Sequence, residues 1–353
     1  MARQDAGRGT SGPDQNPDRD RGRQADNPIE IPAPGWRDII LRAWRESGDD
    51  NVGLIAAGVA FYGFLALVPL LGAFILTYGL LADPRTVLAN VQALFRLLPQ
   101  DAARLIGDQL VQITQQSAGK TGLGLVASLA LSLYGAMNGA SAMVTALNIA
   151  YDEEERRGFI KRNLLVLAIT IGAVLVCVLG MLAMGALAAL ERLVPGAPAP
   201  IVLAVRIAFW ILAALAASFA LAALYRYGPN RDEAQWSWLT PGALVATIGW
   251  IVMTLGFGIY AANFANYNAT YGALGTVVVL LMWLYLSAYV VILGAELNAE
   301  MEHQTARDTT KGPERPMGMR DAAVADTLGE VPPGIGQGQR QSPERPPSER
   351  GRS

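Results

Sequence analysis

The sequence predicts an all-α, polytopic integral membrane protein with six transmembrane helices, a kinked or broken first span and disordered termini. The first observation is composition, because 52% of the residues are hydrophobic and only 16% are charged. The second is pattern: several apolar stretches exceed the roughly 20 helical residues that cross a hydrocarbon core of about 30 Å. The segment VVVLLMWLYL (277–286) is apolar on every face, whereas a membrane β-strand alternates apolar and polar residues.

Six stretches are long and apolar enough to span the bilayer, and together they define a transmembrane domain at 35–302. Their approximate bounds are 53–82, 122–147, 163–190, 201–224, 239–261 and 273–298. The flanking segments 1–34 and 303–353 are rich in Arg, Asp, Gln, Pro and Gly and nearly free of large apolar residues. We expect both to be disordered tails, because such segments bury too little apolar surface to offset the entropy of folding.

Arginine and lysine in the short loops set the expected orientation, because cytoplasmic loops carry an excess of these residues. The connection after the second span, YDEEERRGFIKRN (151–163), holds four basic residues, and the connection after the fourth holds Arg226 and Arg231. Both loops are therefore expected in the cytoplasm. An even number of spans places both termini on that side as well.

The first span contains residues that a simple apolar anchor lacks, namely Gly58, Tyr62, Gly63 and Pro69. Pro69 removes one helical hydrogen bond and clashes with the preceding turn, so we expect a kink or break nearby, while the glycines allow another helix to approach closely. The carbonyl that the proline frees needs a partner inside the protein or in water. The kinked face, which includes Tyr62, therefore either lines a pathway or serves helix packing only.

Two amphipathic segments lie outside the spans. In WRDIILRAWRES the apolar residues recur with helical spacing while the arginines project elsewhere, which predicts an interfacial helix at 36–48 in the headgroup layer. A second amphipathic pattern at 85–116, divided by Pro99, predicts a helical hairpin on the outer face. The hairpin either caps the bundle or guides a ligand into it.

Polar residues within the apolar stretches are candidate pathway or ligand positions. Asn138 stands between Gly135 and Gly139, whose GxxxG spacing is typical of close helix crossings, so Asn138 either bonds to a neighbouring helix or contacts a ligand. Arg206 lies near the start of the fourth span. It either snorkels to the outer interface or faces inward, at a cost of roughly 3 kcal/mol if it is centred in the bilayer.

The sixth span supplies further candidates at both of its ends. Glu296 and Asn298 close it within LGAELNAE, where they either pair with an arginine at the cytoplasmic edge or are hydrated there. The segment NFANYNATYGALG precedes and enters this span, and it contains Tyr271, Gly272 and Gly275. This composition predicts a tight turn with aromatic anchors at the membrane interface.

Residues suited to metal or redox chemistry are scarce. Cys177 is the single cysteine and His303 the single histidine. Cys177 lies in an apolar span, where we expect a small packing residue, and we expect His303 to be exposed. Because zinc and disulfide sites need several such residues, the sequence predicts no metal and no cofactor.

Four motifs occur in the order found in a known family. They are AFYGFLALVP in the first span, YRYGPN after the fourth, YNATYGALG before the sixth and WLYLSAYVVILGAELNAE within it. On these motifs the chain, over residues 36–302, resembles the YihY/BrkB family of bacterial inner-membrane proteins. The resemblance implies six helices in the bacterial inner membrane and cytoplasmic termini. It implies little about activity: envelope integrity, serum resistance and lipid export have been proposed for members, and some carry an older label, ribonuclease BN.

The sequence leaves three functions to compare. The preferred hypothesis is a transporter or flippase for a lipid or other amphiphile, because the first span is interrupted, polar residues lie in the spans and an amphipathic hairpin lies outside. The second is a scaffolding protein in which glycines and asparagines pack helices and the tails bind an unknown partner protein. The third, a ribonuclease, is disfavoured, because the largest acidic cluster is the contiguous loop run 152–155 and no separate acid–base pair is evident.

The expected partners follow from the preferred transport hypothesis and the scaffolding alternative. We expect no enzymatic activity, and we expect membrane lipids as partners with no nucleic acid. Whether the chain forms a homo-oligomer stays open, because a GxxxG pair packs helices equally well within one chain and between two chains.

Overall fold

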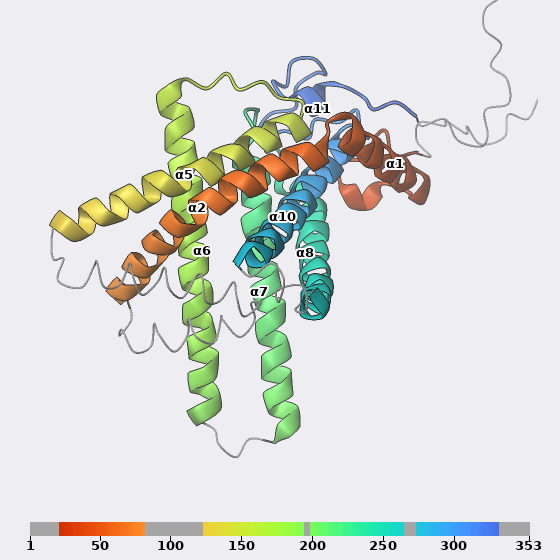
Figure 1. Ribbon diagram of the computed structural model, residues 1–353. Helices are drawn as coiled ribbons and strands as arrows, with labels where there is room; N and C mark the ends of the chain where they lie inside the picture. Colours follow the sequence, from red (N-terminus) through yellow and green to blue (C-terminus); the bar gives the residue numbers. More distant parts are fainter. Residues whose placement is uncertain (1–20, 82–122, 194–197, 265–272, 332–353) are drawn as a thin grey trace, which may run out of the picture.

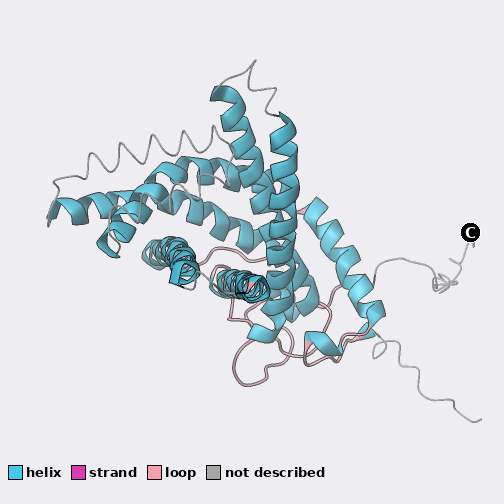
Figure 2. Ribbon diagram, turned by 90° about the horizontal axis from the view of Figure 1, so that it is seen from below, coloured by secondary structure: helices cyan, strands magenta, loops and turns pink. Residues whose placement is uncertain are grey.

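The computed structural model describes residues 21–81, 123–193, 198–264 and 273–331. Within these ranges every regular element is a helix (Figure 2), and one isolated antiparallel bridge joins Ala234 to Thr310. The elements are η2 (Pro28–Glu30), α1 (Ala33–Asp49), α2 (Val52–Leu81), α5 (Leu123–Ala150), α6 (Phe159–Leu193), α7 (Ala199–Tyr227), α8 (Trp236–Phe264), α10 (Ala273–Glu302) and α11 (Ala323–Asp326). The predicted all-α class is confirmed.

Each of the six predicted spans coincides with one long helix, from α2 for the first to α10 for the sixth. Four of these helices, α6, α7, α8 and α10, are long and apolar enough to cross a membrane, and α1 with the first part of α2 qualifies only as a pair bent by 65°. The described residues thus contain four candidate spans, or five with the bent pair, and the predicted count of six is not reached there. Figure 1 shows α2 and α5 side by side and oblique to α6 and α7.

The interruption before the first long helix falls at residues 50–51 and not at Pro69. Asn51 adopts a left-handed φ of 55°, and its N–H donates to the Gly48 carbonyl at 3.1 Å. A left-handed residue directly after a helix is a common C-cap, and Asn tolerates this conformation better than most residues. From there α2 runs through Pro69 without a break, as a single helix over Val52–Leu81. The predicted break at Pro69 is therefore not found, and the bend of 65° lies instead between α1 and α2.

The core lies where five long helices converge towards one end of the molecule. Its members are mostly small residues of α2, α5, α7, α8 and α10, and they include Ala56, Ala146, Ala150, Ala222, Ala243, Ala246, Ala288, Ala295 and Ala299. Membrane helices associate through close backbone packing rather than through the hydrophobic effect, and small residues permit that approach. Away from this end α6 and α7 extend beyond the other helices (Figure 1) and expose large apolar side chains such as Leu179 and Leu212.

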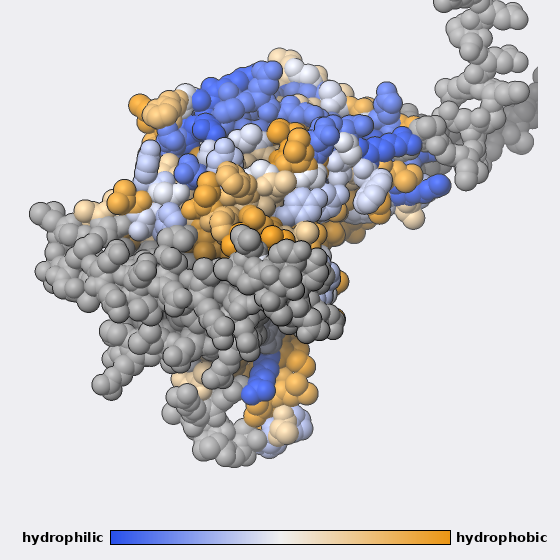
Figure 3. Space-filling model, in the orientation of Figure 1, coloured by the Kyte–Doolittle hydropathy of each residue, from blue (hydrophilic) through white to orange (hydrophobic). Residues whose placement is uncertain are grey.

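Both described terminal segments fold onto the same end of the bundle. The Ala306 N–H donates to the Arg23 carbonyl at 2.9 Å, which joins the N-terminal segment to the residues after α10. The loop at 151–158 joins them as well, because the Glu153 carboxylate accepts a hydrogen bond from the Ala323 N–H at 2.8 Å. Figure 3 shows hydrophilic surface gathered there, at the top of the view, above hydrophobic surface. We call this region the polar end.

The polar end corrects the extent of the predicted tails. Residues 21–34 and 303–331, which we expected to be disordered, are folded, and Thr305 and Thr309 are completely buried. The rest of both tails, 1–20 and 332–353, lies outside the described residues. Composition predicted disorder because these segments hold few large apolar side chains, but their order comes from buried polar contacts.

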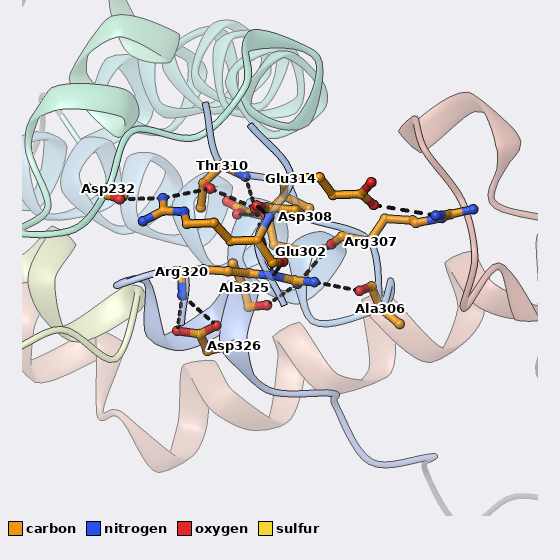
Figure 4. A network of polar contacts seen from close by, with 12 residues as sticks. Asp232, Glu302, Ala306, Arg307, Asp308, Thr310, Glu314, Arg320, Ala325 and Asp326 are labelled. Carbon is orange, nitrogen blue, oxygen red and sulfur yellow. Dashed lines mark hydrogen bonds and ion pairs between the residues drawn. The ribbon is translucent and has the colours of Figure 1, made fainter. Parts of the chain in front are cut away.

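Arg320 organises the C-terminal segment. Its guanidinium is buried and donates to four backbone carbonyls, those of Ala306, Arg307, Arg315 and Ala325, at 2.6–3.1 Å (Figure 4). A charged donor that satisfies several carbonyls replaces the apolar core that the segment lacks.

Asp308 completes this network. Its carboxylate accepts hydrogen bonds from the Thr310 hydroxyl at 2.7 Å and from the Arg315 N–H at 2.8 Å. Burial alone would raise the pKa of Asp308, but these hydrogen bonds outweigh it and hold the pKa below its usual value. The ionised carboxylate is thus the form that the folded segment favours.

Replacement of Arg320 by Ala should release the segment 305–326, because the four carbonyls lose a charged donor worth about 2 kcal/mol or more. In hydrogen–deuterium exchange of the detergent-purified protein, the amides of this segment should exchange about tenfold faster or more. The long helices should keep their protection. Arg156→Ala is the control, because the ion pair of Arg156 with Glu154 is highly exposed. Wild-type protection of 305–326 in the Arg320 variant would contradict the role assigned to Arg320.

Candidate functional site

The helix that follows the bend meets α5 through small residues. A Cβ atom on Gly135 would lie 2.8 Å from the ring of Pro69, and one on Gly139 would lie 3.2 Å from the Ala66 Cβ and 3.5 Å from the Gly63 Cα. The close crossing predicted from the GxxxG spacing is therefore confirmed. The ring of Pro69 fills the space that Gly135 leaves, so Pro69 takes part in helix packing.

Three candidate positions lie on the outer surface of the helices. Tyr62 is 48% exposed, and its ring makes an edge contact with the ring of Phe61. Asn138 on α5 and Arg206 on α7 are exposed as well. A Cβ on Gly58 would meet no atom of the described residues within 4 Å, so the helix contact predicted for Gly58 is missing from that part of the chain.

Several predictions fall outside the described residues. Tyr271 and Gly272 lie there, as does the hairpin predicted at 85–116. Gly275 is placed in the first turn of α10. The turn predicted before the sixth span and the outer hairpin both stay predictions.

The single cysteine and the single histidine both differ from expectation. Cys177 is exposed on α6 and does not serve as a packed core residue. His303 is mostly buried, with its ring nitrogens 3.2 Å from a Glu300 carboxylate oxygen and 2.9 Å from the Thr327 hydroxyl. We expected His303 to be exposed because composition predicted a disordered C-terminal tail. The tail is folded here instead and supplies Thr327 as a partner.

Asn298 forms hydrogen bonds with the backbone of α8 next to a proline. α8 contains Pro241, which has no N–H to donate and disturbs the backbone hydrogen bonds around it. The Asn298 Oδ1 accepts a hydrogen bond from the Gly242 N–H at 2.8 Å, and the Nδ2 donates to the Leu239 carbonyl at 3.1 Å. Asn298 is completely buried, and its amide links α8 to α10.

The same two helices approach each other closely at a pair of glycines. A Cβ on Gly242 would lie 2.2 Å from the Gly294 carbonyl oxygen, and a Cβ on Gly294 would lie 2.7 Å from the Tyr225 hydroxyl. That hydroxyl donates to the Val291 carbonyl at 2.7 Å, which ties α7 to α10. Sequence reasoning missed this contact, although a Pro-Gly pair inside an apolar stretch was the signal that a helix needs an outside partner there.

Two buried ion pairs hold the last turns of α10 at the polar end. Arg42 of α1 pairs with Glu300, and side-chain exposure in this pair is at most 7%. Arg231 pairs with Glu302 at 2.6 Å, and side-chain exposure there is at most 2%. Removing one partner of such a pair costs about 3–5 kcal/mol, because it leaves a buried charge uncompensated. These two arginines therefore fix α10 to α1 and to the loop before α8.

Glu296 lies one turn away from these pairs and has no such partner. It is 2% exposed, and its Oε1 has no hydrogen-bond partner among the described residues. Its carboxyl contacts that of Asp50 at the α1–α2 bend, and the carboxylates of Glu46, Asp152 and Glu300 face it too. We call Glu46, Asp50, Asp152 and Glu296 the carboxyl cluster. A buried ionisable group inside a membrane helix is costly and marks a functional site by default.

The carboxyl cluster does not resemble a metal centre. Within the described ranges, no three side chains of His, Cys, Asp or Glu are arranged so that they could hold a metal ion. Of the candidate residues from the sequence, the structure brings Glu296 and Asn298 into one region and leaves Tyr62, Asn138 and Arg206 on outer surfaces. Glu296 is the residue whose surroundings require a functional explanation.

Comparison with known proteins identifies relatives of the chain. The model of a family described as Virulence factor BrkB matches residues 43–318. A protein of Bacillus subtilis (strain 168) named ribonuclease-like protein YfkH is 34% identical, over 69% of this chain and 88% of its own length. UPF0761 membrane proteins of Ralstonia nicotianae and Nitrosospira multiformis are 27% and 28% identical, over 76% and 74% of this chain. The matches cover only 59% and 60% of these two relatives' own lengths. No solved structure matches the chain.

Replacement of Asn298 by Leu should destabilise the fold, because the Gly242 N–H and the Leu239 carbonyl would be left unpaired at about 1–3 kcal/mol each. The midpoint of thermal unfolding in detergent should fall. Asn298→Asp should also lower the midpoint, because it sets a second oxygen against the Leu239 carbonyl and buries an ionisable carboxyl. Asn138→Leu, at an exposed position, is the control. A midpoint for Asn298→Leu equal to that of wild type would show that the link contributes no stability.

The glycine contact gives a second test on the same two helices. Gly242→Ala should lower the unfolding midpoint, because its methyl group would overlap the Gly294 carbonyl, and such overpacking costs about 1–3 kcal/mol. Gly256→Ala on the same helix meets no described atom within 4 Å and should be neutral or slightly stabilising. Equal midpoints for the two variants would mean that α8 and α10 do not approach as closely as described.

Proposed function

Since the chain belongs to the Virulence factor BrkB family of membrane proteins, we propose that it moves a lipid or another amphiphile across a membrane in maintenance of the cell envelope. The observation that carries the proposal is the buried Glu296 in the carboxyl cluster. A protein that only packs helices loses stability by keeping an unpartnered carboxyl inside an apolar helix. In a transporter, a buried carboxyl can bind a proton or another coupling ion, because transporter ion sites lie where membrane helices are interrupted.

The chemistry of the outer surfaces favours an amphiphile as cargo. Most of α7 is exposed, and its exposed side chains include Leu203, Ile207 and Trp210. Arg206 is exposed among them. A guanidinium on a lipid-facing surface matches an anionic headgroup, and the apolar residues around it match acyl chains. The cargo class proposed is therefore an amphiphile with an anionic head.

The proposed setting is the bacterial inner membrane, with the polar end in the cytoplasm. The two relatives of which this chain covers about three fifths are bacterial membrane proteins. The loops rich in Arg and Lys meet both terminal segments at the polar end, and such loops favour the cytoplasmic side. The proposal places Arg206, near the start of α7, towards the opposite side.

A scaffolding role is the second candidate, and specific contacts favour it. Gly135, Gly139 and Asn298, which the sequence offered as pathway or packing residues, lie in contacts between helices where the described structure includes them. The folded segment 303–331 also presents a polar surface of defined shape, to which a partner protein could bind. Under this reading the lipid-facing sides of α6 and α7 would contact other membrane proteins or a second copy.

A ribonuclease is not proposed. The ribonuclease-like name belongs to the Bacillus relative, and the part of this chain that the structure describes offers no cluster of ligands for a catalytic metal ion. The acidic run at 152–155 is engaged in loop contacts, since Glu155 binds Arg157 and Asn148 and Glu153 binds the Ala323 N–H. Burial would raise the pKa of Glu155, but the hydrogen bonds from Arg157 and Asn148 outweigh it and lower the pKa.

Reconstitution into lipid vesicles tests the transport proposal. Fluorescent lipids with an anionic or a zwitterionic headgroup are placed in both leaflets, and a membrane-impermeant quencher reports how fast inner-leaflet lipid reaches the outer leaflet. Wild type should accelerate the anionic lipid by about tenfold or more over protein-free vesicles, a lowering of the barrier by about 1.4 kcal/mol.

The variants assign this activity to residues. Arg206→Gln should slow the anionic lipid more than Arg206→Lys does, because Lys keeps the charge but lacks the planar fork of Arg. Glu296→Gln should slow transport of both lipids, and Gly256→Ala is the control. If neither lipid moves faster than in protein-free vesicles, with or without a pH difference across the membrane, the transport proposal is wrong and the scaffolding role takes its place.

A further inference from the structure

The contact between Asp50 and Glu296 joins two parts of the chain that are far apart in sequence. Asp50 lies in the short connection between α1 and α2, where the helix pair bends by 65°. Glu296 lies on the last turns of α10 and is almost completely buried. The two helices that flank Asp50, α1 and α2, both pack against α10, and this packing brings the Asp50 carboxyl to that of Glu296. Two carboxylates in such a contact form a hydrogen bond only when one of them carries a proton.

The basic groups that contact the last turns of α10 are engaged by other carboxylates. Arg42 pairs with Glu300 and also donates to the Gln304 Oε1 at 2.9 Å. Arg231 pairs with Glu302. His303 bonds to Glu300 as well. Against these pairs, the Glu296 Oε1 has no partner in the described part of the chain, so the structure supplies no cation that would compensate a second negative charge.

The ends of three helices add to this negative environment. α1 ends just before Asp50, and α10 is in its last turns at Glu296. α5 ends in a motif in which Asp152 takes a left-handed φ of 54°, its N–H donates to the Ile149 carbonyl at 2.9 Å and the Glu153 N–H donates to the Asn148 carbonyl at 2.7 Å. Helix C-termini carry partial negative charge from their unpaired carbonyls, which disfavours an ionised carboxylate nearby.

The titratable groups that face the two carboxyls are nearly all acidic. They are Glu46, Asp49, Asp152, Glu300 and the phenol of Tyr151. Burial, followed by the charge of Asp152, raises the pKa of the Asp50 carboxyl to about 6, although its contact with Glu296 acts in the opposite direction. The charge environment and the geometry therefore agree that this place holds a proton more tightly than ordinary carboxylates do.

We propose that Asp50 and Glu296 form a proton-binding site in which the two carboxyls share one proton between the α1–α2 bend and α10. The occupant is a proton and not a metal ion, because no described group of side chains could hold a metal. Binding changes the charge of the pair from −2 to −1. As a means of driving amphiphile movement with a proton gradient, the site rests on the proposed function; as a proton site it stands on the contact alone.

Loss of the proton has a structural consequence. It places two negative charges side by side in a partly desolvated region, where they repel each other. The connection at 50–51 is the joint between α1 and α2, so repulsion from α10 acts on the angle of the bent pair. Proton release thus favours a separation of Asp50 from Glu296, and proton binding restores the contact.

Infrared spectroscopy of the protein in lipid nanodiscs tests the site without any transport assay. Wild type at neutral pH should show the carbonyl band of a protonated carboxylic acid, which shifts in D2O. Glu296→Gln should remove this band, and Asp50→Asn should change its frequency, because the hydrogen-bonding partner of the acid differs. Asp49→Asn, which neutralises the exposed neighbour of Asp50, should leave it unchanged. If wild type lacks the band, or if the band is identical in wild type and Glu296→Gln, the shared proton does not exist.

A second measurement guards against misfolding of the variants. Because the folded pKa of Asp50 is raised, the stability that its protonated form contributes is present below the ordinary pKa of an aspartate and is lost as the pH rises through about 6. The thermal midpoint of wild type should therefore fall relative to Asp50→Asn between about pH 5 and about pH 7, and Asp49→Asn should follow wild type. This titration is that of the second proton, whose loss turns the neutral pair into the pair that shares one proton at neutral pH. Parallel pH profiles for wild type and Asp50→Asn would show that Asp50 does not titrate as the partner of Glu296, and would contradict the site.

The two proposals fail in different ways. An infrared band that depends on Glu296, together with vesicles in which no lipid moves, supports the proton site and overturns transport. Lipid movement by a protein without that band supports transport and overturns the proton site. A transport rate that responds to a pH gradient in wild type but not in Glu296→Gln supports both.

Discussion

A polar group buried away from water, in the membrane helices or in the polar end, must find its hydrogen-bond partner within the chain. Much of the described structure answers this constraint. Asn298 supplies an acceptor and a donor to the backbone that Pro241 disturbs, and Arg320 supplies donors to four carbonyls of a segment that has little apolar core. Glu296 is one of four described side chains with a buried polar atom that has no hydrogen-bond partner, together with Tyr151, Arg226 and Thr254, and it is the carboxyl among them. This buried carboxyl is the reason for placing the candidate site at Glu296.

The arrangement of the helices places Glu296 beside the bend between α1 and α2. Small residues let α2, α5, α7, α8 and α10 converge near the polar end, while α6 and α7 extend beyond the other helices in Figure 1. The left-handed Asn51 turns α1 away from α2, and that turn carries Asp50 to Glu296. The described structure thus combines a packed end, which contains the contact of Asp50 with Glu296, and two helices, α6 and α7, that expose large apolar side chains. The transport proposal gives a role to both features, whereas the scaffolding proposal accounts for the packed end alone.

The candidate site divides into residues that local pattern revealed and residues that it did not. Gly135 and Gly139 have the spacing of a close crossing, and they meet α2 as that spacing implies. Glu296 was visible as an acid within an apolar stretch, but its partner Asp50 was not, because the contact depends on the angle between α1 and α2, which the pattern of either helix does not record. Asn298 resembled a pathway residue, because a buried amide looks the same in sequence whether it binds a ligand or a neighbouring backbone.

By itself the sequence determined the number and approximate bounds of the long helices, the membrane setting and the grouping of the basic loops. These features follow from hydropathy and charge, which act over a single helix or loop. Only the tertiary structure decided that segments 21–34 and 303–331 fold, that the bend lies at 50–51, and that Asp50 meets Glu296. Each of these depends on hydrogen bonds or charge contacts between residues distant in the chain, and composition does not record which distant groups meet.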